Sequence, residues 1–305
     1  MSWFYIALIA PFLWAICNLI DKVLIEKYMQ RDHSVVVLLL YSMLFSVFVF
    51  PVVYMLRPAV IHVELGNALL FMLAGVVEMA AVGLYLRALL DDDASRVVPF
   101  YQLIPLFSVI LGYVVLGEVL TMPQLIAGAI IIMGGMLLTF EFSEDSPSRF
   151  KWGLLGLMLL SSFCYSLYDT LFKFSAIRES FWAGIFWQHL GSALAACALL
   201  VCARRYRAQF FANVRTNGAK VVSLNLTNEF LYTLGIIVLS FSLLLAPIAL
   251  VATANVYQPI FVFVIGLFFT LFLPHILEES LSPRHMAIKG LAIVTIFIGS
   301  AYLLQ

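Results

Sequence analysis

The sequence predicts an all-α, polytopic membrane protein with ten transmembrane helices, arranged as two inverted five-helix repeats around a central cavity. Three observations support this fold class. The mean hydropathy is +1.05, and hydrophobic residues make up 64% of the chain against 11% charged residues. The chain also contains ten long apolar runs, and the first five resemble the last five. A soluble fold is excluded, because it would lack the polar residues needed to cover its surface.

Each apolar run is about as long as a membrane-crossing helix, which needs about 20 residues at 1.5 Å rise per residue. The expected spans, in chain order, are 3–25, 34–55, 66–90, 97–116, 121–140, 152–174, 180–202, 221–245, 248–273 and 284–304. The connections between them are short, and the longest is expected at about 203–220. We therefore expect no separate soluble domain.

The internal repeat is visible where corresponding spans of the two halves carry similar residues. AICNLIDKVL (15–24) aligns with FCYSLYDTLF (163–172), which places Asp21 opposite Asp169. Pairs of proline and glycine residues further along the halves align in the same order. The similarity therefore rests on order and spacing more than on identical residues.

The expected division of the membrane domain is 1–145 for the first repeat and 146–305 for the second. Each repeat has an odd number of spans, so the two enter the membrane in opposite directions. The loops after the odd-numbered spans, together with the flanking ends of those spans, hold 14 of the 17 Lys and Arg residues. Because cytoplasmic loops are enriched in basic residues, this count predicts that both termini face outward.

One stretch resembles a known family. The run YLRALLDDDASRVVPFYQLIPLFSVILGYVVLGEVLTMPQLIAGAIIIMGG (85–135) looks like the EamA-type repeat of the drug/metabolite transporter superfamily. LSFSLLLAPIALVATANVYQPIF in the second half looks like a degraded copy of it. The resemblance implies ten helices, a central substrate cavity and transport of a small metabolite.

Several residues of this run have a structural explanation. Thr121 and Gln124 have the spacing of a capping box at the start of the fifth span. Glu118 is expected beside the same helix N-terminus, where a negative charge is favoured. Small residues allow helices to approach closely, which is the role expected for Gly128, Gly134, Gly135, Gly290 and Gly299.

Two acidic residues lie where hydrocarbon is expected. Glu78 is at the middle of the third span, and Glu229 is close to the middle of the eighth. Asn225, Asn228 and Tyr232 share one helix face with Glu229. An acidic residue at mid-membrane costs about 2.5–3.5 kcal/mol and is normally retained where it faces a cavity or a partner. Both glutamates are therefore predicted substrate or proton sites.

Two corresponding spans show the same one-face pattern of polar residues. The first span carries Trp14, Asn18 and Asp21, and the sixth carries Tyr165 and Asp169. Their spacings of three, four or seven residues place them on a single helix face. We expect both faces to line the central cavity.

Lys173 follows Asp169 by one helical turn and is expected to pair with it. This pair and Asp21 have an equally good interpretation as structural ion pairs near the interface. The remaining candidate lining residues are Tyr101, Gln102, His189, Asn255, Tyr257 and Gln258.

The resulting functional hypothesis is a secondary transporter that moves a small polar or amphipathic metabolite by alternating access, with protons as the candidate coupling ion. An amino-acid-like, cationic or zwitterionic solute is favoured, because the expected cavity contains acids and few cations. The alternative is a lipid-linked flippase or an accessory membrane subunit. No enzymatic activity, cofactor, metal or nucleic-acid partner is expected, and the expected location is a bacterial inner membrane.

Overall fold

The protein was analysed as a computed structural model, which describes residues 2–28, 34–91, 98–139, 152–272 and 283–303. Within these ranges the chain forms eleven α-helices and four short 3₁₀ or π segments, and no strand is assigned to any of the residues they contain. The predicted all-α class is therefore confirmed for the described part of the chain.

The first half of the chain contains five α-helices and three short segments. In order they are α1 (Ser2–Tyr28), α2 (Ser34–Leu56), η1 (Pro58–Ile61), α3 (Leu65–Asp91), η2 (Val98–Leu103), α5 (Ile104–Leu111), the π segment η3 (Gly112–Leu116) and α6 (Met122–Thr139). The second half contains α7 (Trp152–Ala176), α8 (Phe181–Cys202), α9 (Arg204–Leu243), α10 (Ile248–Thr253), η4 (Ala254–Tyr257), α11 (Gln258–Phe272) and α12 (Pro283–Leu303).

Seven helical stretches of the described chain are long and apolar enough to cross a membrane. The other three predicted spans appear as shorter apolar helices at Phe100–Leu116, Met122–Leu137 and Ala287–Leu303. At 17 residues or fewer, each of these would reach about 25 Å, which is less than the hydrocarbon core of a typical bilayer. Ten full-length spans are therefore not confirmed.

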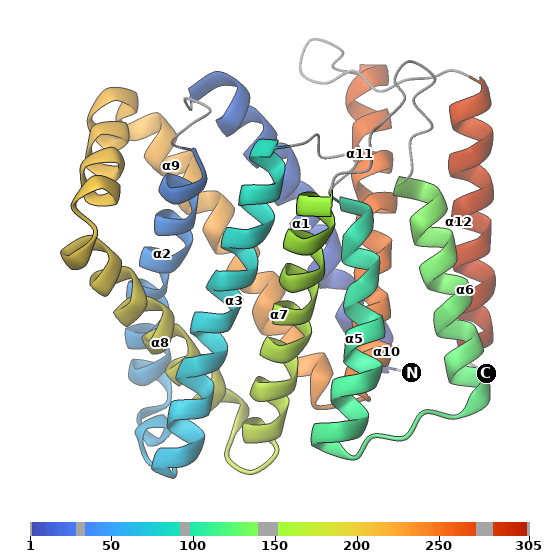
Figure 1. Cartoon of the computed structure of the whole chain (residues 1–305), viewed down its shortest axis with the longest axis horizontal. Helices are drawn as coiled ribbons and strands as arrows, with labels where there is room; N and C mark the ends of the chain where they lie inside the picture. Colours follow the sequence, from blue (N-terminus) through green and yellow to red (C-terminus); the bar gives the residue numbers. More distant parts are fainter. Residues whose placement is uncertain (1, 29–33, 92–97, 140–151, 273–282, 304–305) are drawn as a thin grey trace.

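The helices pack mainly as pairs taken from the two halves of the chain. α1 packs on α9, α2 on α8, α3 on α7 and α6 on α12. Figure 1 shows α6 and α12 side by side at one edge of the bundle, with both chain ends on the same side of the molecule. The core is consequently built from contacts between residues far apart in the sequence.

The fourth and ninth predicted spans are interrupted rather than continuous. In each, a short 3₁₀ segment precedes an α-helix whose second residue is proline: η2 before Pro105, and η4 before Pro259. Proline lacks the amide hydrogen of a regular helix and is tolerated in the first turn. The two prolines therefore explain why both spans are broken at the same relative position.

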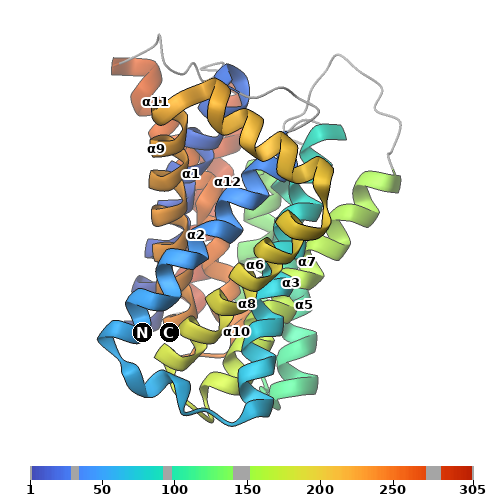
Figure 2. The ribbon, with the colours of Figure 1, turned by 90° about the vertical axis from the view of Figure 1, so that its left-hand side faces the viewer.

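The prediction of a connecting loop at 203–220 was wrong, because this stretch forms the first part of the 40-residue helix α9. Figure 2 shows this part crossing one end of the bundle before the helix runs along α1. Phe210 is buried against Tyr41 and anchors the segment on α2. The apolar side of an amphipathic helix was hidden in the sequence by its many arginines.

Small residues bring α6 and α12 together. A Cβ atom added to Gly134 would lie 3.0 Å from the backbone nitrogen of Ile296, and one added to Gly299 would lie 3.1 Å from the carbonyl oxygen of Ala127. The expected close approach is confirmed at these two glycines and at Gly135. It is not seen at Gly128, where the nearest atom to an added Cβ would be 3.9 Å away, or at Gly290, where none lies within 4 Å.

The predicted capping box at the start of α6 is present. The amide of Gln124 donates to Thr121 Oγ1 at 3.4 Å, and the amide of Thr121 donates to Gln124 Oε1 at 2.9 Å.

Candidate functional site

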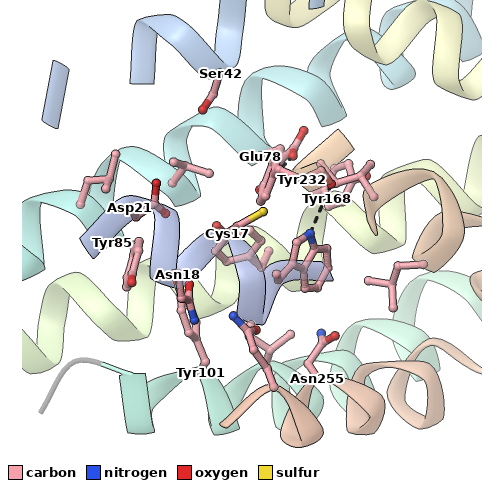
Figure 3. A pocket seen from close by; sticks show the side chains of 18 of the residues that line it. Cys17, Asn18, Asp21, Ser42, Glu78, Tyr85, Tyr101, Tyr168, Tyr232 and Asn255 are labelled. Carbon is pink, nitrogen blue, oxygen red and sulfur yellow. Dashed lines mark hydrogen bonds between the residues drawn. The ribbon is translucent and has the colours of Figure 1, made fainter. Parts of the chain in front are cut away.

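A central cavity lies between α1, α3, α7 and α9 and reaches the broken spans at η2 and η4. It has about 160 Å³ of room for the centres of water molecules. Figure 3 shows Asn18, Asp21, Glu78, Tyr232 and Asn255 arranged around it. Residues from both halves of the chain therefore meet at one place.

Most of the side chains predicted to line a cavity do line this one. They are Trp14, Asn18, Asp21, Glu78, Tyr101, Gln102, Tyr165, Asp169, Asn228, Glu229, Tyr232, Asn255 and Gln258. The one-face spacings of the first, sixth and eighth spans account for most of this agreement, because each face points inward.

The cavity is acidic. Asp21, Glu78, Asp169 and Glu229 all line it, and among its described lining residues none is lysine, arginine or histidine. Glu78 is 2% exposed and Asp169 is 4% exposed. Four carboxyl groups are thus brought together in a low-dielectric interior, where removing a charge from water is expensive.

Two of the carboxyl groups are held by short hydrogen bonds. Asn228 Nδ2 donates to Asp21 Oδ1 at 2.7 Å, and Ser42 Oγ donates to Glu229 Oε1 at 2.6 Å. Both bonds link helices from different halves of the chain, α1 with α9 and α2 with α9. They position these two acids on one side of the cavity.

The other two carboxyl groups are less constrained. Tyr232 donates its hydroxyl hydrogen to Glu78 Oε1 at 3.3 Å, which is a long hydrogen bond. Asp169 makes no hydrogen bond or ion pair with any residue that the structure describes. The carboxyl group of Asp169 is therefore available inside the cavity.

The predicted pairing of Lys173 with Asp169 was wrong. Lys173 Nζ instead lies 2.5 Å from Glu118 Oε1 and donates to the carbonyl oxygen of Ala246 at 2.6 Å. The turn between α9 and α10 offers a free carbonyl, and Glu118 offers a carboxylate. Together they offer the lysine two oxygen acceptors, whereas Asp169 on the same helix face would offer only its carboxylate.

Glu118 lies at a helix N-terminus, as expected, but the helix is a different one. Its Oε2 accepts a hydrogen bond from the backbone amide of Ile248 at 2.8 Å, so the carboxylate caps α10 and not α6. Sequence order alone placed it beside the nearest helix start, whereas the fold brings a more distant one to it. Glu279, which the repeat aligns with Glu118 when GEVLTMPQLIAG is matched to LEESLSPRHMAIKG, lies outside the described residues.

Aromatic rings form much of the cavity wall. The rings of Tyr85 and Tyr101 lie 5.0 Å apart, and those of Tyr101 and Tyr165 lie 5.7 Å apart. On the opposite side, Trp14 Nε1 donates to the backbone oxygen of Tyr232 at 3.3 Å. Rings placed beside carboxyl groups suit a solute with a positive charge, because their faces attract cations.

Three predicted site residues do not line the central cavity. Asn225 donates to the carbonyl oxygen of Val221 in its own helix at 2.9 Å. Tyr257 bonds to Ser300 and packs among apolar residues. His189 lines a smaller, adjacent cavity together with Glu78. For Asn225 and Tyr257, spacing along the sequence did not reveal that the side chain makes a hydrogen bond to nearby backbone or to another helix.

The prediction also missed polar lining residues, namely Cys17, Ser42, Tyr85 and Tyr168. Tyr85 could have been found, because it follows Glu78 by seven residues on the same helix face. Ser42 gave a weaker signal, since only another small polar residue, Ser46, follows it at helical spacing in an apolar run.

Close helix contacts fix the two sides of the cavity. A Cβ atom added to Gly75 would lie 2.2 Å from the backbone oxygen of Gln188, so α3 lies directly on α8. A Cβ atom added to Gly235 would lie 2.5 Å from the Nε1 atom of Trp14. Glu78 follows Gly75 by one turn, and this contact therefore determines its depth.

Comparison with known proteins agrees with these observations. Residues 1–140 match the sequence model of the EamA-like transporter family. No curated protein matches the chain. One solved structure, titled only "Crystal structure of protein", has a TM-score of 0.62 with 14% identity, covering 99% of this chain and 96% of the other. This likeness concerns the fold alone, and it extends over both halves.

The family match confirms the resemblance seen in the sequence. It is consistent with the seven described helices that are long and apolar enough to cross a membrane. The chain is an integral, multi-pass membrane protein whose residues 1–140 match the EamA-like transporter family.

Proposed function

We propose that this protein is a secondary transporter for a small polar or amphipathic solute that carries a positive charge. The solute is cationic or zwitterionic, and it crosses the membrane by alternating access in exchange for protons. The observation that carries the proposal is the lining of the central cavity, in which four acids occur and no basic side chain is described.

The chemistry of the lining favours a cation over an anion. A carboxylate a few ångströms from a cation attracts it strongly in a low dielectric, and the tyrosine faces add about 0.5–2 kcal/mol. The amides of Asn18 and Gln258 could bind the carboxylate of a zwitterion. An anion without such a positive end would meet only like charge.

Charge balance supports the exchange with protons. Several uncompensated charges inside a membrane domain are costly. When the cavity changes from opening on one side of the membrane to opening on the other, cations or protons must therefore neutralise its four carboxyl groups. A solute cation and protons can replace one another in this role.

The two inverted repeats belong to the same proposal. Support comes from the helix pairs, in which α1 with α9 corresponds to α7 with α3, and from the two proline-associated breaks at η2 and η4. In transporters of this type the solute site lies near the pseudo-axis between repeats and is formed by interrupted helices. The division at 1–145 and 146–305 follows from it. The proposed orientation, with both termini outward in a bacterial inner membrane, rests instead on the distribution of Lys and Arg among the loops.

A binding screen on the purified protein in lipid nanodiscs tests the proposal. The probes are choline and 2-phenylethylammonium, with neutral analogues (3,3-dimethyl-1-butanol and 3-phenylpropanol) and an anionic analogue (3-phenylpropanoate). A cation that binds the folded state raises the unfolding temperature in a concentration-dependent way. We expect at least one cation, and neither the neutral nor the anionic analogues, to do so.

Transport is then measured in proteoliposomes that contain a pH-sensitive dye. We expect addition of the bound cation to cause cation uptake and an opposite movement of protons. The proposal is wrong if 3-phenylpropanoate binds as well as the cations, or if a cation is bound and no uptake follows. A C-terminal reporter that is fluorescent in the cytoplasm would separately contradict the outward termini.

A further inference from the structure

A second, much smaller cavity adjoins the central one and contains the only predicted site histidine. Its polar lining residues are Ser42, Ser46, Glu78, His189, Glu229, Tyr232 and Thr233. The room for water centres is about 10 Å³, which is sufficient for about one molecule. Ser42, Glu78, Glu229 and Tyr232 also line the central cavity, so the two spaces share a wall.

The contacts around this space connect an acid with the histidine. Ser42 donates to Glu229 at 2.6 Å, and Ser46 Oγ lies 3.1 Å from His189 Nδ1. Ser42 and Ser46 are one turn apart on α2, about 6 Å by helical rise. His189 Nε2 is buried and has no partner among the described residues. A single water between the two serine contacts would complete a hydrogen-bonded chain.

The groups that face His189 come from every neighbouring helix. α3 contributes Glu78, and α9 contributes Glu229 and Tyr232, while the described lining from α2 contains only serines as polar groups. From α7, Tyr168 reaches the neighbouring Gln188 at 3.4 Å. The charged groups close to the histidine are therefore the two glutamates.

We propose that the proton and the solute occupy different parts of the site. The solute cation binds at Asp169 and the tyrosines, and the exchanged proton is held by Glu229 and His189 across the small cavity. This inference rests on the proposed cation–proton exchange and assigns its two ligands to separate residues.

The proton transfer is simple to balance. A hydronium ion in the central cavity loses a proton to the Glu229 carboxylate, which breaks one of its O–H bonds, forms an O–H bond on Glu229 and leaves water. The proton can pass through Ser42, the cavity water and Ser46 to Nδ1 of His189, where each transfer breaks one O–H bond and forms the next, and the last forms an N–H bond. The reverse transfer returns it to Glu229 and then to water on the other side. No oxidant, reductant or further reactant is needed.

The test compares three variants at buried polar residues. His189→Asn and Ser46→Ala each change a member of the proposed hydrogen-bonded chain. Ser192→Ala is the control, because it removes a hydroxyl that is also buried, on α8, but lines neither cavity. For each we would measure the pH profile of cation transport, the half-saturating cation concentration, and the protons released on cation binding in weak buffer. The probe is the cation that gives the larger thermal shift in the binding screen.

We expect His189→Asn and Ser46→Ala to shift the midpoint of the pH profile by about one unit and to change the half-saturating concentration less than twofold. Ser192→Ala should change neither. Unchanged pH profiles in both variants, or a change confined to cation affinity, would overturn the separate proton site. If His189→Asn does not fold, Ser46→Ala decides the result. Wild-type protein that transports the cation without proton movement would overturn the exchange itself, and this inference with it.

Discussion

The two sides of the central cavity are built from corresponding helices, yet the acids on the two sides differ in their hydrogen bonds. On the side of α1 and α9, Asp21 and Glu229 each accept a short hydrogen bond, at 2.7 and 2.6 Å. On the side of α3 and α7, Glu78 accepts only a 3.3 Å bond, and Asp169 has no described partner. Two similar backbones thus carry two different pairs of carboxyl groups. The pair on α1 and α9 is occupied by short hydrogen bonds, and the pair on α3 and α7 is available to a ligand.

This difference shows that an approximate repeat can divide two tasks between its copies. Asp21 and Asp169 occupy equivalent positions in the aligned repeats, but only Asp21 has an amide within reach. Because an acid with a fixed donor is already stabilised, it has less to gain from a ligand. We therefore expect the α3 and α7 side to bind the solute more strongly.

The largest expected effect separates the two aspartates. Asp169→Asn should weaken binding of the cation found in the binding screen by about a hundredfold, whereas Asp21→Asn should weaken it by less than about tenfold. Equilibrium binding to protein in nanodiscs measures both. Equal losses in the two variants would show that the sides are equivalent, and a normal unfolding temperature for each variant provides the control.

Packing of the two sides should differ as well. Gly75→Ala places a Cβ atom 2.2 Å from a backbone oxygen, while Gly235→Ala meets a side-chain ring at 2.5 Å. We expect losses of about 2 and about 1 kcal/mol respectively, because a backbone atom moves less easily than a side chain. Reversible unfolding in detergent tests this order. Gly128→Ala is the control, since its nearest contact is 3.9 Å away.

Releasing Lys173 should make the two sides more alike. Glu118→Gln removes the carboxylate that holds Lys173, which can then turn back to Asp169 and neutralise it. Cation affinity should fall about tenfold. The double variant Glu118→Gln with Lys173→Met should recover it, because no lysine remains to occupy the site. Failure of the double variant to recover binding would mean that Glu118 acts by another route.

The smallest expected effect concerns the two hydroxyl donors. Ser42→Ala removes a 2.6 Å bond to Glu229 and should cost about 1 kcal/mol of stability. Tyr232→Phe removes a 3.3 Å bond to Glu78 and should cost about 0.5 kcal/mol or less. Thermal unfolding of both variants in the same detergent compares them. A larger loss for Tyr232→Phe would reverse the assignment of the occupied side.

Much of the fold could be predicted because membrane spans depend on local composition. Apolar run length located the helices, and the helical spacing of Trp14, Asn18 and Asp21 correctly placed them on the cavity face. The aligned prolines lie at the points where two spans are interrupted, but neither the interruptions nor their 3₁₀ geometry was predicted. These features depend on neighbours in the sequence and can be recognised without a structure.

The features that escaped prediction depend on contacts between distant segments. Nothing near Lys173 in the sequence indicates that Glu118 and Ala246 lie beside it. The helical state of 204–220 likewise depends on Phe210 packing against α2. Tyr257 and Asn225 were misplaced for the same reason, since a polar residue on the expected face can still make its hydrogen bond outside the cavity.

The junction formed by Glu118 has a consequence for how that end of the bundle can separate. One carboxylate joins the ends of α5 with η3, of α7 and of α10, through a lysine ammonium group and a backbone amide. Moving one of these helices away leaves a charged group or a backbone amide without its partner. A buried polar group without a partner costs several kcal/mol. A slightly opened junction is consequently unfavourable unless water enters at once. This end of the molecule should therefore exist in only two forms, one with the Glu118 junction closed and one with it open and filled with water.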